Sequence, residues 1–183
     1  VGSGMSGGWA AKELCEKGLK TLVLERGRDV KHVTDYPTAA LNPWELTHRN
    51  MITEEDIKTY PIQSKVYHFG EDNKHFFVKD TDHVYQQAKP FQWNRGYHVG
   101  GRSLLWSRHT FRWSDLDFEA NRKEGVATDW PIRYNDIAPW YDYVESFIGV
   151  RGKNEGLPQL PDGKFIPAFE MNFLEKHLKK RIE

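Results

Sequence analysis

The first eight residues, Val1 to Gly8, hold the residues best suited to approach a phosphate group. Gly2, Gly4 and Gly7 form the pattern G-x-G-x-x-G, in which each glycine meets a different steric demand. The first permits a tight turn, the second lets the backbone touch a pyrophosphate, and the third lets a following helix lie close to a sheet. The start of that helix would add N–H groups and a positive dipole end. The pattern therefore predicts a dinucleotide site.

Glu25 is the second candidate for nucleotide chemistry. It follows the apolar run Thr21–Leu24 and stands 18 residues after Gly7. Such a run is typical of a parallel strand buried on both faces, and an acid at the end of that strand can bind ribose hydroxyls. The alternative is a tight turn followed by an ordinary salt-bridged glutamate. Arg26 and Arg28 come next, and they suit either an adenine or phosphate contact or a solvated loop.

These side chains need a helix and strands to position them. The spacing predicts a helix over Trp9–Lys17, with Gly18 as its C-terminal stop and Cys15 packed in the core. Helix, strand, glycines and acid together predict an α/β protein with a Rossmann-like domain. Such a unit needs a strand before its first glycine, where only Val1 stands. We therefore expect the sequence to be a fragment, cut before this position.

A second glycine stretch runs from Gly96 to Ser107. Gly100 and Gly101, followed by Ser103, suit another close approach of the backbone to a ligand. The alternative is a glycine turn before a strand. The region between the two glycine motifs, about 35–92, is predicted to be an insertion. It would pack over the cofactor or over a neighbouring subunit, so the sequence leaves a homo-oligomer open.

Helix signals recur along the rest of the chain. We expect helices that begin at Asn42, Thr53, Ser114, Trp130 and Asn172, the third ending near Gly125 and the fourth at Gly149. The apolar residues of the fourth are predicted to face the core. Short strands are predicted at Tyr67–Phe69, Phe76–Val78 and Phe111–Trp113. Residues 151–168 are rich in Gly and Pro and indicate a linker.

Composition excludes several classes of function. The chain carries 26 basic and 26 acidic residues, so charge gives no support for nucleic-acid or membrane partners. No apolar run approaches the roughly 20 residues that span a bilayer. The single cysteine excludes an internal disulfide, and the eight histidines form no pattern of metal ligands. No G-x-S-x-G nucleophile motif is present.

Four stretches together resemble the glucose–methanol–choline (GMC) oxidoreductases, nearest the branch of pyranose oxidases and gluconate or sugar dehydrogenases. They are G-S-G-M-S-G-G, L-E-R-G, R-G-Y-H-V-G-G-R-S and W-P-I-R-Y-N-D-I-A-P-W-Y, and they span most of residues 1–150. The resemblance implies FAD. It implies the following residues around the cofactor: Gly2, Ser3, Gly4, Met5 and Ser6 at the pyrophosphate; Glu25 at the adenosine ribose; Arg95, Gly100, Gly101 and Ser103 along the FAD; Trp106 and Ser107 near the isoalloxazine.

The chain departs from that family at two points. Some pyranose oxidases carry a histidine, linked covalently to the flavin, two residues after the serine of the G-G-x-S run; here that position is Leu105. We therefore expect FAD to be bound without a covalent link. The family's catalytic histidine and its partner lie further toward the C-terminus, so no residue of this chain is assigned a catalytic role.

The expected organisation is an FAD-binding domain over residues 1–150, with a linker and the start of a substrate domain over residues 151–183. The expected activity is hydride transfer to FAD from a CH–OH group of a sugar, a sugar acid or an alcohol, with the electron acceptor unspecified. Two alternatives remain open. One is a dehydrogenase that uses NAD(P) on the same motif, and the other is a non-catalytic fragment that binds a nucleotide.

Overall fold

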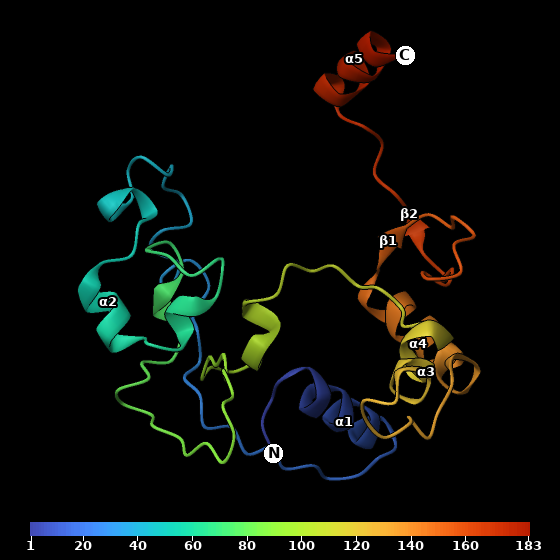
Figure 1. The fold of residues 1–183 in the computed structure, drawn as a ribbon, viewed down its shortest axis with the longest axis horizontal. Coiled ribbons are helices and arrows are strands. Elements are labelled where there is room, and N and C mark those ends of the chain that lie inside the picture. The colour runs from blue at the N-terminus through green and yellow to red at the C-terminus, as the bar shows by residue number, and fades with distance from the viewer. The chain divides into compact units, whose positions relative to one another are not determined.

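The computed structural model describes residues 1–183, which divide into two compact units, Val1–Ser107 and Arg108–Glu183. Figure 1 labels their helices and strands. None of the helices combines the length and the apolar composition that crossing a membrane would require.

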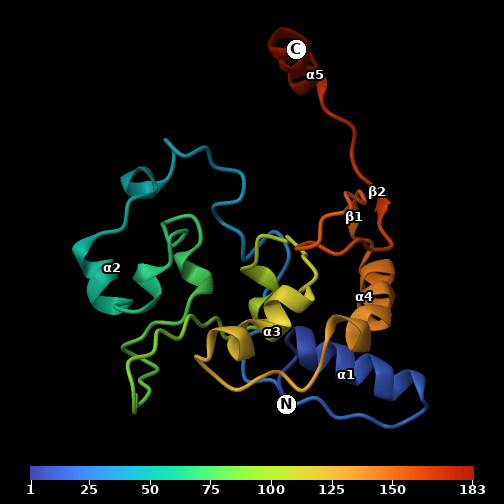
Figure 2. The same cartoon turned by 45° about the vertical axis from the view of Figure 1, so that its right-hand side comes forward.

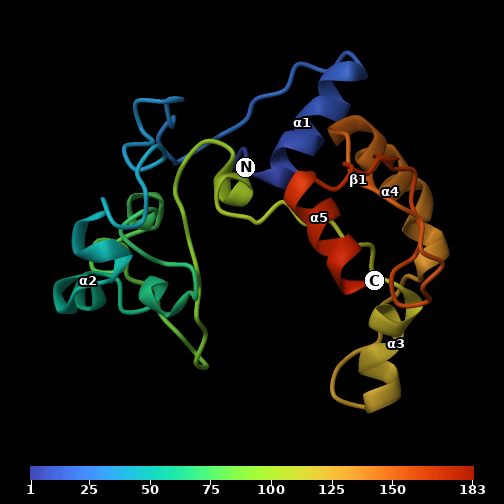
Figure 3. The ribbon, with the colours of Figure 1, turned by 90° about the horizontal axis from the view of Figure 1, so that it is seen from above.

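The first unit contains two α-helices and four short 3-10 helices. They are α1 (Met5–Glu16), η1 (Thr47–Asn50), α2 (Glu54–Thr59), η2 (Gln63–Lys65), η3 (Lys74–Phe76) and η4 (Gly101–Leu104). Within this unit α1 lies apart from α2, and long irregular segments join them (Figures 1 and 3). A small aromatic cluster of Tyr60, Phe69 and Phe77 forms the core beside α2.

Helix α1 confirms the predicted helix, and it begins four residues earlier than expected because Gly4 is its N-cap. The prediction of a buried Cys15 was wrong, since this thiol is exposed. Thr21–Leu24 forms no strand here, and Leu22 remains 82% exposed. The Gly2 N–H donates to the Leu24 carbonyl oxygen (2.6 Å), but no partner strand covers the run. The Rossmann-like sheet therefore stays a prediction.

The predicted strands at Tyr67–Phe69 and Phe76–Val78 were wrong. Aromatic residues from these two runs pack against one another across 3-10 turns, with the Phe69 and Phe77 ring centroids 5.1 Å apart. The start at Thr53 is confirmed by α2, where Thr53 and Asp56 form a capping box. No helix begins at Asn42, where the chain makes a single turn.

The second unit contains three helices and a two-stranded parallel sheet. They are α3 (Asp115–Glu124), α4 (Tyr134–Ile148), β1 (Arg151–Gly152), β2 (Ile166–Pro167) and α5 (Phe173–Ile182). The three predicted helices of this region are confirmed, while the strand at Phe111–Trp113 was wrong. Helix α5 stands at the end of an extended segment, away from β1 and β2 (Figures 1 and 2).

The predicted apolar core face of α4 was wrong in part. Trp140 and Phe147 are 65% and 61% exposed, and Glu145 is the buried residue of this helix. Glu145 is buried because Arg112 reaches it from the segment before α3. The Arg112 Nε–Glu145 Oε1 and Arg112 Nη2–Glu145 Oε2 distances are 2.8 and 2.5 Å. A bidentate ion pair therefore helps to hold α4 against the segment before α3.

Candidate nucleotide-binding site

The start of α1 lacks the side-chain cap that α2, α3 and α5 have. Gly4 caps it with extended backbone (φ −66°, ψ −175°), no side chain accepts a hydrogen bond there, and its first turn holds no acidic residue. By contrast, Thr53, Ser114 and Asn172 cap α2, α3 and α5 with side-chain oxygens. Helix N-terminal N–H groups without such an acceptor suit an anion such as a phosphate.

The first glycine turn is closed as tightly as its sequence predicts. Gly2 has a φ of +80°, which favours glycine. A Cβ atom on Gly7 would collide with the Gly2 carbonyl oxygen, so α1 begins directly against the turn. The space beside Gly4 is open toward the second glycine turn. A Cβ added to Gly4 would meet only the Gly100 carbonyl oxygen, at 4.0 Å. Met5 and Ser6 lie exposed in the first turn of α1.

Glu25 is held at the first glycine turn by three hydrogen bonds. Its Oε2 accepts the Ser3 N–H and the Ser3 hydroxyl, both at 2.7 Å, and its Oε1 accepts the Gly27 N–H at 2.7 Å. These bonds, the Ser3 hydroxyl foremost, lower the pKa of the Glu25 carboxyl to about 2. Glu25 is therefore an anion at neutral pH and can accept further hydrogen bonds from a ligand hydroxyl.

The two glycine motifs meet in space although 97 residues separate Ser3 from Gly100. The Gly100 N–H donates to the Ser3 hydroxyl (3.0 Å), and a Cβ on Gly101 would lie 3.3 Å from the Gly4 Cα. Gly100 and Gly101 both have positive φ, +84° and +55°. Ser103 follows in η4, and its N–H donates to the Gly100 carbonyl oxygen (3.1 Å). The structure thus brings together the glycines that the sequence predicts for one site.

The segment after Glu25 runs beside the segment before Gly100. Arg28 and His98 form a parallel bridge. Gly27 allows this approach, because a Cβ there would collide with the His98 backbone nitrogen. The Arg26 guanidinium carbon lies 3.8 Å from the centre of the Tyr97 ring. Sequence reasoning missed this pairing; the signal in the chain was a glycine two residues after the acid.

Arg95 is engaged within the protein. Its side chain is 4% exposed, and its Nη2 donates to Asp80 Oδ1 (3.2 Å) and to the His83 carbonyl oxygen (2.8 Å). The buried Gln63 donates from its Nε2 to the same Asp80 oxygen (3.0 Å). Burial alone would raise the pKa of Asp80, but hydrogen bonds from Gln63, Ile62 and Arg95 outweigh it and lower that pKa. The predicted contact of Arg95 with the cofactor stays a prediction.

Trp106 and Ser107 follow η4 at the end of the first unit. Trp106 is half-buried and Ser107 is exposed. Their placement beside an isoalloxazine ring stays a prediction. The preceding Leu105 packs against the aromatic cluster of Tyr60, Phe69 and Phe77.

Cavities also lie outside the glycine turns, one of about 400 Å³ beside α2 among them. The first unit holds one of about 190 Å³ beside the Arg28–His98 bridge, lined also by His75. The His98 imidazole is 2% exposed, and burial is the main cause that lowers its pKa. Because that pKa lies below its ordinary value, His98 remains neutral at neutral pH.

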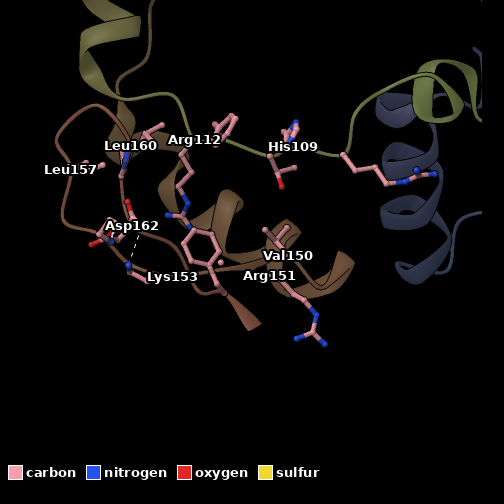
Figure 4. Close-up of a pocket in the computed structure, with 15 residues that line it drawn as sticks. His109, Arg112, Val150, Arg151, Lys153, Leu157, Leu160 and Asp162 are labelled. Carbon is pink, nitrogen blue, oxygen red and sulfur yellow. Dashed lines mark hydrogen bonds and ion pairs between the residues drawn. The ribbon is translucent and has the colours of Figure 1, made fainter. Parts of the chain in front are cut away.

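The second unit holds a cavity of about 350 Å³ with largely apolar walls. In Figure 4 Leu157 and Leu160 lie on one side of it, Arg112 reaches toward it, and the Arg151 side chain points away. Asp162 accepts the N–H groups of Glu155 (2.9 Å) and Gly156 (3.2 Å), which fixes the loop that closes this cavity. None of the residues predicted to bind the cofactor lines it.

No family model matches the chain. Several curated proteins are similar to it, among them two dehydrogenases and a flavoprotein. It is 28% identical to the fructose dehydrogenase large subunit of Gluconobacter japonicus over 94% of this chain and 31% of that protein. It is 26% identical to 2-methyl-1,2-propanediol dehydrogenase of Mycolicibacterium austroafricanum over 88% and 26%.

The third relative is the gluconate 2-dehydrogenase flavoprotein of Pantoea cypripedii, which is 30% identical over 83% of this chain and 25% of that protein. The chain thus spans between a quarter and a third of the length of these relatives. Each alignment includes most of this chain. The chain is similar to oxidoreductases, one of which is named as a flavoprotein.

Proposed function

We propose that this chain forms the nucleotide-binding part of an FAD-dependent GMC-type oxidoreductase that oxidises a CH–OH group of a sugar, a sugar acid or an alcohol. The observation that carries the proposal is the contact between the two glycine turns. Ser3 accepts the Gly100 N–H and donates to Glu25, so three stretches that the resemblance assigns to FAD converge at one point.

The residues present fit the nucleotide half of FAD. The α1 start without a side-chain cap suits the pyrophosphate, and the absence of a Cβ at Gly4 and Gly101 keeps room for a close backbone approach. The ionised Glu25 carboxylate suits a ribose hydroxyl. FAD, when bound, would accept the hydride from the substrate carbon. The residues of this chain would bind and orient its nucleotide.

A Rossmann-like fold is part of the proposal. Thr21–Leu24 would be a strand that leads to Glu25, as in other dinucleotide-binding units. The Gly2–Leu24 hydrogen bond at the end of this segment, and the parallel Arg28–His98 bridge just after it, support parallel pairing along this part of the chain. The 82% exposure of Leu22 is explained if further strands cover it in the assembled sheet.

The names of the relatives support the substrate class. They act, by name, on fructose, on gluconate and on a diol, and all three substrates carry CH–OH groups. The experiment is to purify, loaded with flavin, the full-length oxidoreductase of which this chain is proposed to be the nucleotide-binding part, and to add aldoses, ketoses, sugar acids and simple diols under anaerobic conditions. Bleaching of the flavin absorbance by one class of these compounds supports the proposal. Protein with bound flavin that no such compound bleaches would contradict the substrate class.

A further inference from the structure

We propose that Ser3 is a positioning residue of this site: its hydroxyl holds the Glu25 carboxylate and the second glycine turn in place before a cofactor arrives. The expected effect on FAD affinity rests on the proposed function. The role of the Ser3 hydroxyl in holding Glu25 and Gly100 does not, because it applies to the chain without any ligand.

The hydroxyl of Ser3 bridges two groups, a carboxylate that needs a hydrogen-bond donor and a backbone N–H that needs an acceptor. It donates to Glu25 Oε2 (2.7 Å) and accepts from the Gly100 N–H (3.0 Å). A hydroxyl carries one donor and two acceptor positions, so one oxygen atom can serve both partners. Alanine at this position would remove a donor from an ionised carboxylate and the acceptor from a half-buried N–H. The Ser3 N–H would still reach Glu25 (2.7 Å), because it belongs to the backbone.

The contact matters because little else joins the two turns. Gly4 and Gly101 contact each other only through backbone atoms. A Cβ added to Gly101 would lie 3.3 Å from the Gly4 Cα. Helix α1 and η4 pack together at this point. Without the Ser3 hydroxyl the two turns would touch each other only by van der Waals contact, and they would otherwise be tied through the backbone pairing of Arg28 with Tyr97 and Val99. We therefore assign the register between the two turns to the Ser3–Gly100 hydrogen bond.

The same bonds determine how Glu25 would meet a ribose. A carboxylate offers about four acceptor positions, and Ser3 occupies two of them on Oε2. Gly27 occupies one on Oε1 (2.7 Å). The Arg26 backbone contributes a further hydrogen bond to this carboxylate. Ser3 and its neighbours thereby fix the orientation in which Glu25 would meet a ribose hydroxyl.

The test compares Ser3→Ala and Ser3→Val, which lack the hydroxyl, with Ser3→Thr, which keeps it and matches valine in size. The protein without ligand is measured first, by hydrogen exchange at the Gly100 amide and by NMR titration of the Glu25 carboxyl. In Ser3→Ala we expect roughly ten-fold faster exchange at Gly100. We also expect a Glu25 pKa closer to its ordinary value. Ser3→Thr and the control Ser64→Ala, a serine elsewhere in the same unit, should match the original protein.

FAD affinity is the second measurement. Ser3→Ala and Ser3→Val should weaken FAD binding by roughly ten-fold, and Ser3→Thr should restore it. If Ser3→Ala does not fold, the Thr and Val pair still decides, because the two differ only in the hydroxyl. Gly100 exchange and a Glu25 pKa that stay unchanged in Ser3→Ala, or a Thr variant that behaves like Val, would overturn the inference. A protein that binds no FAD at all would instead contradict the proposed function, and the measurements on the unliganded chain would still test Ser3.

Discussion

Gly27 lies so close to His98 that a Cβ atom on Gly27 would collide with the His98 backbone nitrogen. Two backbone hydrogen bonds hold the segments together, from the Arg28 N–H to the Tyr97 carbonyl oxygen (3.3 Å) and from the Val99 N–H to the Arg28 carbonyl oxygen (2.9 Å). This pairing connects the segment that follows Glu25 to the segment that leads into the second glycine turn.

Replacing Gly27 with alanine should therefore separate the two segments. We expect Gly27→Ala to destabilise the first unit by roughly 1–3 kcal/mol, as overpacking commonly does. Urea unfolding measures the change. The control is Gly8→Ala in α1, where the nearest atom to a new Cβ is 3.9 Å away and the midpoint should be unchanged or raised. Equal midpoints for Gly27→Ala and the original protein would refute the close contact.

The lowered pKa of Glu25 predicts that the free energy of unfolding decreases at acidic pH. Its folded pKa is about 2 and its ordinary value is 4.5, so the unfolded chain takes up the proton first as pH falls. The contribution of Glu25 is complete above pH 4.5 and is lost as pH falls from 4.5 through about 2. Glu25→Gln should make unfolding midpoints depend less on pH in this window. An identical pH profile for the two proteins would show that the Glu25 hydrogen bonds do not form.

The ion pair of Arg112 with Glu145 predicts a strong effect in the second unit. Both side chains are buried, and Arg112 also donates to Asp142 (2.6 Å). The hydrogen bonds to Glu145 are the main cause that raises the pKa of Arg112, and the bond to Asp142 adds to it. Arg112→Ala leaves Glu145 buried without its partner and should cost roughly 3–5 kcal/mol. Arg122→Ala removes an arginine that is 53% exposed and should leave stability nearly unchanged. Similar unfolding midpoints for the two variants would contradict this assignment.

Leu105 predicts how the flavin is held. A leucine side chain has no nucleophilic atom, and here it packs against the aromatic cluster rather than standing free. Flavin should therefore leave the protein on acid precipitation and remain in the supernatant. Yellow colour that stays with the washed, denatured pellet would indicate a covalent link to another residue.

The elements that sequence reasoning predicted correctly are those with local chemical signals. Ser114 and Asn172 accept hydrogen bonds from the first turns of their helices, and Gly125 and Gly149 end helices with positive φ. Each signal acts within a few residues, so it can be read without the rest of the fold.

The strands could not be predicted in this way. Preference for β-structure depends on which neighbours cover the two faces of a strand. Phe76 and Phe77 have the composition of a strand, yet they pack on Tyr36 and Phe69 from a 3-10 turn. Leu22 would need flanking strands to be buried.

The site shows the same division. The glycines and Glu25 were recognisable from their spacing, because the pattern follows from steric demands at a pyrophosphate. The bond from the Gly100 N–H to Ser3 was not, since it spans 97 residues and depends on how the intervening segment folds. The same holds for the stacking of Arg26 on Tyr97.

The central claim is that the glycine turns and Glu25 bind FAD, and its most direct measurement is FAD titration of the purified protein followed by flavin fluorescence and calorimetry. The account predicts saturable binding of FAD in preference to NAD(P). It also predicts loss of that binding in Gly7→Ala, where the new Cβ would collide with the Gly2 carbonyl oxygen, and retention in Gly8→Ala. Failure of the unsubstituted protein to bind FAD, or equal FAD affinity in the two alanine variants, would contradict the account.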